Sequence, residues 1–376
     1  MSSRGPERPT PPKPAPPSFR QGVLAHSWSA FHPLPALYCA PGVVLALLAG
    51  AAAGQPGLAV LGAAGAFSAG FGAFQRLTRF HIAPMLLAAI CMGVSMAVGT
   101  VAGANPWVDA AVVAVASFSL GLAASFGTGP WWVLLQGGIF LVIAGAQPGD
   151  WVEGAFRGLI VFAGGAGQIA LVALLRRLAP AGFPPIFAPN AVHTPPTGAA
   201  WLGEARRVIS PRAPEFRYAV VLGLATGSAI LIAHSLRLAH GYWAALTVLL
   251  VLRRGGSETL IRGAQRIGGT MLGAAAATLL VALLRPDPPM LIALIGGVAW
   301  AGYATQWVNY GIFSVSVTSY VAFLLAMLGL PEAQIAWQRV IATLMGGAIG
   351  VAALGLAGLG RGAGKAAFRL LAQGER

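Results

Sequence analysis

Residues 82–101 read IAPMLLAAICMGVSMAVGTV, an uninterrupted run without a charged side chain. An α-helix needs about 20 apolar residues to cross the ~30 Å hydrocarbon core of a bilayer. Two basic residues, Arg76 and Arg79, stand shortly before the run, as is typical of a loop on the cytoplasmic face. The run therefore predicts a transmembrane helix that begins on that face.

Similar runs recur along the whole chain. Only 9% of its residues are charged, against about 25% in soluble proteins. The sequence predicts an all-α membrane protein with about twelve transmembrane helices. They are expected over Leu34–Ala53, Leu58–Phe74, Ile82–Val101, Val108–Phe126, Trp131–Ala146, Trp151–Leu175, Tyr218–Leu236, Tyr242–Leu252, Ile267–Leu284, Met290–Thr305, Ile312–Leu328 and Arg339–Leu359.

The distribution of the 24 Lys and Arg residues predicts the orientation. Threading the helices alternately, with the N-terminus in the cytoplasm, places all but four of these residues on the cytoplasmic side. The four at the outer side are Arg157, Arg237, Arg285 and Arg339. Because an excess of basic residues in cytoplasmic loops sets orientation, we expect a multi-pass protein of the bacterial cytoplasmic (inner) membrane. Both of its termini are expected in the cytoplasm.

The net charge of +14 also raises the question of nucleic-acid binding. The basic residues, however, are spread over loops between apolar segments and form no basic domain, which a nucleic-acid-binding protein would need. We therefore expect membrane lipids, and no nucleic acid, as partners.

The predicted helices fall into two blocks of six around a proline-rich linker, in which a short helix is expected near Trp201–Val208. The expected units are a disordered Pro-rich cytoplasmic tail (1–33), the first block (34–176), the cytoplasmic linker (177–216), the second block (217–359) and a basic cytoplasmic tail (360–376). Tails this rich in proline are typically extended and disordered.

The two blocks show signs of an internal repeat. Three features of the first block recur in the second at one constant difference in residue number: Asp150 at Glu332, Arg157 at Arg339, and Gly164-Gly165 at Gly346-Gly347. We call this difference the repeat offset. Six helices are an even number, so both blocks would have the same orientation. This predicts two parallel six-helix repeats related by an axis along the membrane normal, with a transport pathway at the seam between them.

No catalytic constellation is present in the sequence. The histidines are scattered without metal-ligand spacing such as HExxH, and no paired carboxylates suit acid–base catalysis. Cys39 and Cys91 are too few for a disulfide framework or a zinc site. We expect no enzymatic activity and no cofactor.

Polar residues within membrane segments are the main candidates for function, since placing them in lipid is costly. Arg157 and Arg339 lie near the outer ends of the sixth and twelfth predicted helices. Two guanidinium groups facing one seam would bind a carboxylate. The alternative is that each reaches the lipid headgroups or pairs with Asp150 or Glu332, and the sequence leaves this choice open.

Two further pairs complete the expected substrate-binding set. Gln265 and Arg266 begin the ninth predicted helix, and they form either a cytoplasmic mouth for anions or an ordinary basic anchor. Tyr242 and Trp243 begin the eighth, and they belong either to the site or to the aromatic belt at the membrane interface.

The second block resembles a known family. Residues 241–251 (GYWAALTVLLV) and 262–273 (RGAQRIGGTMLG) carry the patterns of the fusaric acid resistance (FUSC) family, a GYW segment with a following Leu-Thr and then R-x-x-G-T-x-x-G. Gln338-Arg339 and Gly346-Gly347 fit the same family. The resemblance covers about residues 215–358, and the first block matches mainly in its number of helices and in Arg157.

This resemblance implies an inner-membrane transporter that exports aromatic or other organic acid anions. The chain is more distantly similar to the plant aluminium-activated malate transporters, which are anion channels. Two alternatives stay open: a channel or uniporter driven by the membrane potential, because no acid lies near the middle of a predicted helix, and an envelope protein without transport. The sequence also leaves open whether a periplasmic adaptor subunit or a second copy of the chain takes part.

Overall fold

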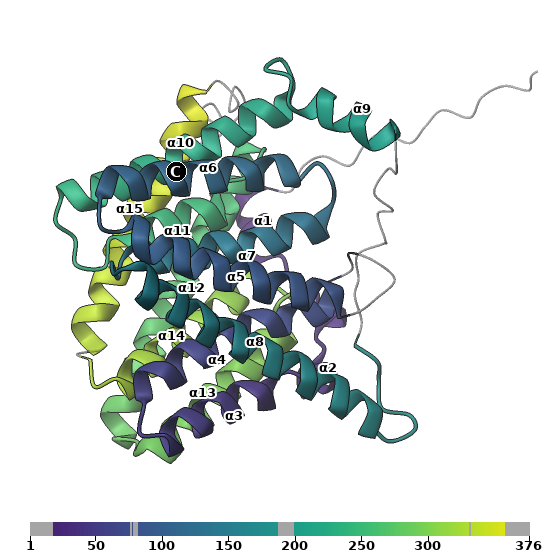
Figure 1. The fold of residues 1–376 in the computed structure, drawn as a ribbon, viewed down its shortest axis with the longest axis vertical. Coiled ribbons are helices and arrows are strands. Elements are labelled where there is room, and N and C mark those ends of the chain that lie inside the picture. Colours follow the sequence, from purple (N-terminus) through teal and green to yellow (C-terminus); the bar gives the residue numbers. More distant parts are fainter. Residues whose placement is uncertain (1–17, 76, 78–81, 187–198, 331, 358–376) are drawn as a thin grey trace, which may run out of the picture.

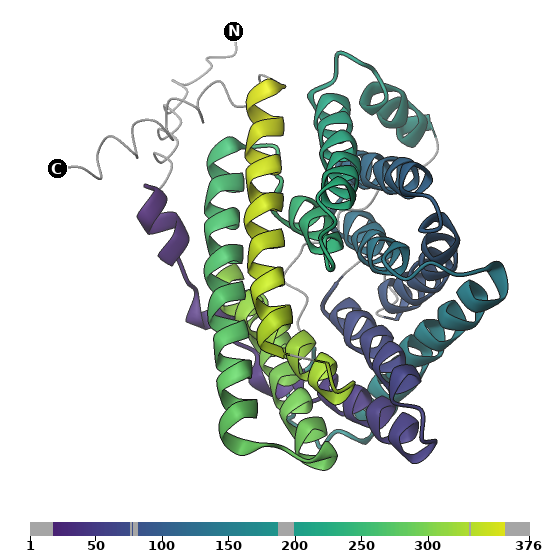
Figure 2. The same ribbon diagram turned by 90° about the vertical axis from the view of Figure 1, so that its left-hand side faces the viewer.

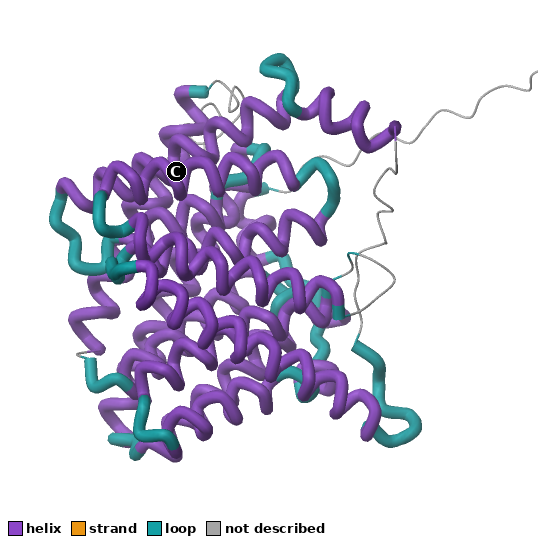
Figure 3. Tube along the Cα trace, in the orientation of Figure 1, coloured by secondary structure: helices purple, strands orange, loops and turns teal. Residues whose placement is uncertain are grey.

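A computed structural model describes residues 18–75, 77, 82–186, 199–330 and 332–357. The described chain consists of helices and loops and includes no strand (Figures 1 and 3). Eleven of its helices are long and apolar enough to cross a membrane. The prediction of an all-α membrane protein is confirmed.

Every predicted transmembrane helix has a counterpart in the structure. The first block contains α2 (Pro33–Ala36) continued by α3 (Ala40–Ala52), α4 (Pro56–Gly70) continued by the 3-10 helix η2 (Phe71–Phe74), α5 (Ala83–Ala102), α6 (Pro106–Ala123), α7 (Thr128–Gly145) and α8 (Trp151–Leu178). The second contains α10 (Pro214–Ser235), α11 (Tyr242–Val251), α12 (Gly256–Leu284), α13 (Pro288–Thr305), α14 (Tyr310–Met327) and α15 (Glu332–Leu356). Several helices begin with proline, which suits the first turn because its missing N–H would have no partner there.

Helix α11 is the exception in length. It has 10 residues, about 15 Å of helix, which is too short to cross the hydrocarbon core. Its residues from Trp243 to Leu249 are all buried inside the protein. Backbone outside regular helix is tolerated at membrane depth where it is enclosed by protein and away from lipid, so the burial explains how α11 can be short.

Helix α12 begins three turns earlier than predicted, at Gly256 instead of Ile267. The sequence pattern excluded this first part because it contains Glu258, Arg262 and Arg266. In the structure, the Arg262 guanidinium lies 4.0 Å from the ring centroid of Tyr310 and donates to the Leu250 carbonyl. Because these contacts accommodate the charge inside the protein, the helix continues through it, and Arg266 lies well inside α12 instead of at its start.

The amino-terminal segment also differs from the prediction of a disordered tail over residues 1–33. Residues 1–17 lie outside the described part, but α1 (Phe19–Leu24) and the 3-10 helix η1 (Trp28–Ala30) are helical. The Ser27 amide donates to the Val308 carbonyl and the Asn309 side chain donates to the Ala25 carbonyl. These hydrogen bonds to the second block order a segment whose composition alone does not favour structure. In the linker, α9 (Ala199–Val208) agrees with the predicted short helix.

The two blocks pack their helices in the same order. In the first block, α4 packs on α3 and α8, and α5 packs on α7 and α8. In the second, α11 packs on α10 and α15, and α12 packs on α14 and α15. Figure 2 shows α12 and α15 side by side. Between the blocks, α6 packs on α10, while α13 packs on α2 and α3.

This correspondence extends to single contacts. Gly164 of α8 lies against the Gly62 carbonyl of α4. When both positions are advanced by the repeat offset, they become Gly346 of α15 and Ala244 of α11, and Gly346 lies against the Ala244 carbonyl. Any side chain at either glycine would collide with that carbonyl.

Contacts between the two blocks also occur in corresponding pairs, in which the residue from the first block and the residue from the second block change places. Phe71 packs edge-on against Phe313 at 5.5 Å. The repeat offset relates Phe71 to Arg253 of the second block and Phe313 to Trp131 of the first, and Arg253 lies over the ring of Trp131. Such an exchange of partners is the pattern expected around a twofold axis.

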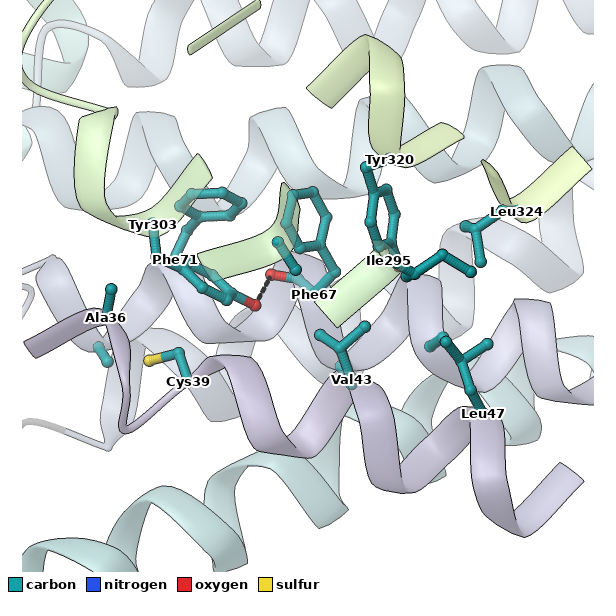
Figure 4. Close-up of a cluster of buried hydrophobic side chains, with 14 of the residues drawn as sticks. Ala36, Cys39, Val43, Leu47, Phe67, Phe71, Ile295, Tyr303, Tyr320 and Leu324 are labelled. Atoms are coloured by element: carbon teal, nitrogen blue, oxygen red, sulfur yellow. Dashed lines mark hydrogen bonds between the residues drawn. The ribbon is translucent and has the colours of Figure 1, made fainter. Parts of the chain in front are cut away.

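An aromatic cluster joins the two blocks (Figure 4). Phe67 of α4 stacks on Tyr320 of α14 with ring centroids 4.0 Å apart. The Tyr303 hydroxyl of α13 donates to the Phe67 carbonyl at 2.8 Å. Phe71 packs against the same tyrosine. The apolar core therefore continues from the first block into the second through this cluster.

Several basic side chains gather at one end of the helices. Arg254 donates to the Ser125 hydroxyl, and Arg254 and Arg207 both lie within ion-pair distance of Glu215. Arg217 donates to the Ala357 carbonyl near the end of α15. These three arginines belong to the side that the sequence assigns to the cytoplasm, and that assignment stays a prediction.

Candidate functional site

Buried polar side chains concentrate in the second block, between α11, α12, α14 and α15. Among the described residues, Arg266 of α12 and Arg339 of α15 are the only Lys or Arg residues that are buried, each 6% exposed. We call these two residues, with Trp243, Thr270, Ser314 and Thr318, the two-arginine site.

Arg339 is held against aromatic rings from α11. Its guanidinium carbon lies 5.2 Å from the ring centroid of Trp243. The ring of His240 stacks on the same tryptophan at 5.0 Å, and His240 also hydrogen-bonds to Gln338 through Nδ1 at 2.6 Å. Tyr242 is close enough to interact electrostatically with Arg339. A cation–π contact stabilises a guanidinium through its face. The N–H donors, which lie in the plane of the guanidinium group, stay free to bind another group.

Arg266 is only partly satisfied. Its Nη1 donates to the Ser314 hydroxyl at 3.2 Å, whereas its Nε is buried without a hydrogen-bond partner. The charges of Arg266 and Arg339 lie close enough to repel each other. The ion pairs in the described part of the chain include neither arginine. Since burying like charges without a counter-charge is costly, this arrangement favours the binding of an anion.

Hydroxyl groups complete the site. The Oγ1 atoms of Thr270 and Thr318 are buried without a partner. Thr318 and Arg339, with apolar residues of α12, α14 and α15, line a cavity of about 20 Å³, room for one water-sized group. The Thr318 hydroxyl beside Arg339, and the Thr270 hydroxyl one turn after Arg266 on the same helix, suit the oxygens of a carboxylate.

The structure brings together four of the six residues that the sequence suggested for substrate binding: Arg339, Arg266, Tyr242 and Trp243. The side chain of Gln265 is engaged elsewhere, since its amide donates to the Val23 carbonyl of the amino-terminal segment. The sixth residue, Arg157, also lies elsewhere, since its described hydrogen bonds go to Gln147 and Glu153 of the first block.

Arg157 is engaged at the end of its own block. It forms an ion pair with Glu153 at 2.6 Å and donates to the Gln147 carbonyl. The sequence suggested Asp150 as its acidic partner, but Asp150 instead caps α8 by accepting from the Glu153 amide. The reason is helix geometry: a residue four positions away lies on the same face, whereas one seven positions away is two turns distant.

The first block has no equivalent of the two-arginine site. The repeat offset relates Arg266, Thr270, Ser314 and Thr318 to Pro84, Ala88, Trp132 and Gln136 of the first block. Only Arg157 corresponds in type. The chain therefore holds one such site within its second block, in place of a symmetric pair of arginines at the seam.

Sequence reasoning missed Thr270, Ser314 and Thr318. A signal was present in their spacing, because Thr270 lies one helical turn after Arg266 and Thr318 one turn after Ser314. Residues one turn apart lie on one helix face. Nothing local indicated, however, that the two faces would meet.

The fold and the site define a multi-pass α-helical membrane protein. Residues 228–353 match the family model described as "Fusaric acid resistance protein-like", and this matched segment contains every residue of the two-arginine site. The resemblance inferred from its sequence motifs is confirmed. The more distant similarity to aluminium-activated malate transporters stays a prediction.

Two curated relatives match a similar length of chain. An uncharacterized protein of Synechocystis sp. is 30% identical over 146 residues, which cover 38% of this chain and 19% of that protein. An uncharacterized protein of Haemophilus influenzae is 29% identical over 136 residues, which cover 36% and 19%. The matches thus span about a fifth of each relative's length. No solved structure matches the chain.

Proposed function

We propose that this protein transports small organic anions across the bacterial cytoplasmic membrane, in the outward direction. The observation that carries the proposal is the pair of buried guanidinium groups, Arg266 and Arg339, neither of which has an acidic partner in the described structure. An intramembrane charge that is not compensated by the protein usually marks a substrate or ion pathway. The match to the fusaric acid resistance-like family supports the same class of function.

The architecture that we propose is two parallel six-helix repeats with both termini in the cytoplasm. The shared order of helix packing and the exchange of partners between Phe71–Phe313 and Arg253–Trp131 support it. All residues of the two-arginine site come from one block. Neither a periplasmic adaptor nor a second copy of the chain is needed to complete the site.

A carrier fits the size of the site better than a permanently open channel. The cavity beside Arg339 accepts one water-sized group, so an organic anion can enter only when the helices around it separate. Export of one negative charge gains ~2.3 kcal/mol per 100 mV of inside-negative potential. The membrane potential can therefore contribute to the driving force.

The test is transport by the purified protein in lipid vesicles under a potassium-diffusion potential. Labelled aromatic and aliphatic carboxylates should accumulate according to the potential. Arg266→Gln and Arg339→Gln should each lower the flux at low substrate at least about tenfold, because a charge-assisted hydrogen bond contributes about 1.5–3 kcal/mol. The matched control is Arg177→Gln, which removes the same charge from an exposed position at the end of α8.

The alternatives give different results. Single-channel currents carried by the same anions would indicate a channel. An absence of flux for every anion tried, with correctly folded protein, would indicate an envelope protein without transport. Full transport by the Arg266→Gln, Arg339→Gln double variant would remove the two-arginine site from the pathway.

A further inference from the structure

Helix α6 contains a buried acid without a partner. Asp109 is 6% exposed, and its Oδ1 is buried without a hydrogen bond. It lies in the first turn of the apolar helix Pro106–Ala123. A carboxylate in such a position is costly, although the positive end of the helix dipole offsets part of that cost. The charged and the neutral form are therefore both accessible.

The surrounding backbone leaves space for this carboxyl group. Gly145 at the end of α7 faces Asp109, and a Cβ atom at Gly145 would lie 2.8 Å from Oδ2 and closer still to Oδ1. Any side chain at position 145 would displace the acid. The glycine and the acid thus fit one another.

No charged group of the described structure compensates Asp109. Helix α7 has no ionisable side chain, and α5 contributes only Cys91. On α10, which packs along α6, His234 and the following Arg237 are exposed, and the other titratable residues lie at the opposite end of the helix. On α8, Glu153 and Arg157 pair with each other.

The two common structural reasons for an acid at this position do not apply. The cap of α6 is already provided by Asn105, whose side chain accepts from the amides of Trp107 and Val108. Packing does not require an acid either. The repeat offset relates Asp109 to Leu291 of α13, which is 7% exposed.

We propose that Asp109 is a proton-binding site that couples anion export to the inward movement of protons. The proposal rests on the transport function proposed above. A proton binds the carboxylate to give the neutral acid, and its release restores the charge. No other bond changes.

A mechanical connection to the anion site runs through α10. Gly227 of this helix lies against the Ala110 carbonyl, next to Asp109, and Gly223 lies against the Ala114 carbonyl. The same helix packs on α11 and α15, which provide Trp243 and Arg339. A change of charge at the contact between α6 and α7 can thus shift the helix that supports the two-arginine site.

The experiment uses inside-out vesicles whose potential is held at zero with valinomycin and equal potassium on both sides. Acidifying the lumen by one pH unit should raise anion accumulation by the wild-type protein, roughly tenfold for one proton per anion. Asp109→Asn and Asp109→Leu should lose this response and keep accumulation driven by the potential. Leu is the residue of the corresponding position in the second block, so this variant is expected to fold.

Each outcome is decisive. A wild-type protein that follows the potential but ignores the pH gradient overturns the coupling and leaves the transport function standing, and so does an Asp109→Leu variant with a full pH response. Infrared difference spectra between mildly acidic and mildly alkaline solution add a readout that needs no transport. They should contain a buried carboxylic acid band that Asp109→Asn removes, and its absence from the wild-type protein also overturns the proposal.

Discussion

At the scale of single residues, Arg157 and Arg339 show how one neighbour changes the role of a side chain. Both occupy the same place in their blocks, since the repeat offset relates one to the other. Arg157 has Glu153 one turn before it and forms an ion pair with it. The corresponding neighbour of Arg339 is Ile335, which is buried and lines the cavity. Arg339 is therefore left without an acid and available to an anion.

This comparison leads to a first prediction. Ile335→Glu should place an acid one turn before Arg339 and create in the second block the pair that exists in the first. We expect anion flux to fall about as far as in Arg339→Gln, since the internal carboxylate competes with the substrate. Vesicle flux of labelled carboxylates measures this. Ile335→Gln, which has a similar size without the charge, is the control, and an equal loss in both variants would contradict the explanation.

A second prediction concerns the geometry of the guanidinium group. Arg339→Lys should recover only part of the flux that Arg339→Gln loses. A lysine provides a point charge but lacks the planar fork that binds a carboxylate through two hydrogen bonds. The apparent affinity for the anion, measured from the concentration dependence of flux, should stay several-fold weaker than in the wild-type protein. Wild-type affinity in the lysine variant would indicate that charge alone matters.

At the scale of elements, close approach of helix backbones positions the site. The short helix α11 provides Trp243, and it reaches α15 through the contact of Gly346 with the Ala244 carbonyl. Small residues at helix contacts allow such an approach in membranes. The adjacent Gly347 is less restricted, because a Cβ atom there would meet only the tip of Ile267 at 3.8 Å.

The third prediction uses this pair of neighbours. Gly346→Ala should lower the midpoint of thermal unfolding in detergent, with a cost of about 1–3 kcal/mol for overpacking. It should also weaken anion flux, because α11 and Arg339 move apart. Gly347→Ala should change both far less. Equal stability of the two variants would show that α11 and α15 can separate without cost.

The fourth prediction concerns the amino-terminal segment. Deleting residues 1–17 should leave thermal stability unchanged, because such proline-rich sequence buries little apolar surface. Deleting residues 1–31 should lower it, since this removes the hydrogen bonds of the segment to Val308, Asn309 and Gln265. The midpoint of unfolding of the two truncated proteins provides the comparison. Equal midpoints would show that the docked segment adds nothing to stability.

At the scale of the whole molecule, orientation follows from the charges. The arginines at positions 207, 217 and 254 meet at one end of the helices, and Arg157 lies near the start of α8, which the threading assigns to the outer side. The positions of these four arginines therefore agree with an orientation in which both termini lie in the cytoplasm.

The fifth prediction tests this orientation. A reporter enzyme that is active only in the periplasm should be active when fused after Gln147 or Arg285. It should be inactive when fused after Arg79, Arg207 or Arg376, because these positions belong to the basic cytoplasmic side. A cytoplasm-dependent reporter at the same five positions is the control and should give the opposite pattern. Periplasmic activity after Arg207 would reverse the threading.

The linear pattern of residues was enough to establish the membrane class, the approximate bounds of most helices, and the family resemblance of the second block, but it did not show that α11 is too short to cross the membrane. These depend on the length of apolar runs and on short motifs, which are local properties of the chain. The structure was needed for the start of α12, the docking of residues 18–33, the pairing of Arg157 with Glu153, and the meeting of Ser314 with Arg266 and of Thr318 with Arg339. It also revealed Asp109 as a buried acid without a partner. Each of these depends on which residues of a distant helix lie beside the residue in the folded protein, and the local sequence pattern does not determine that neighbour.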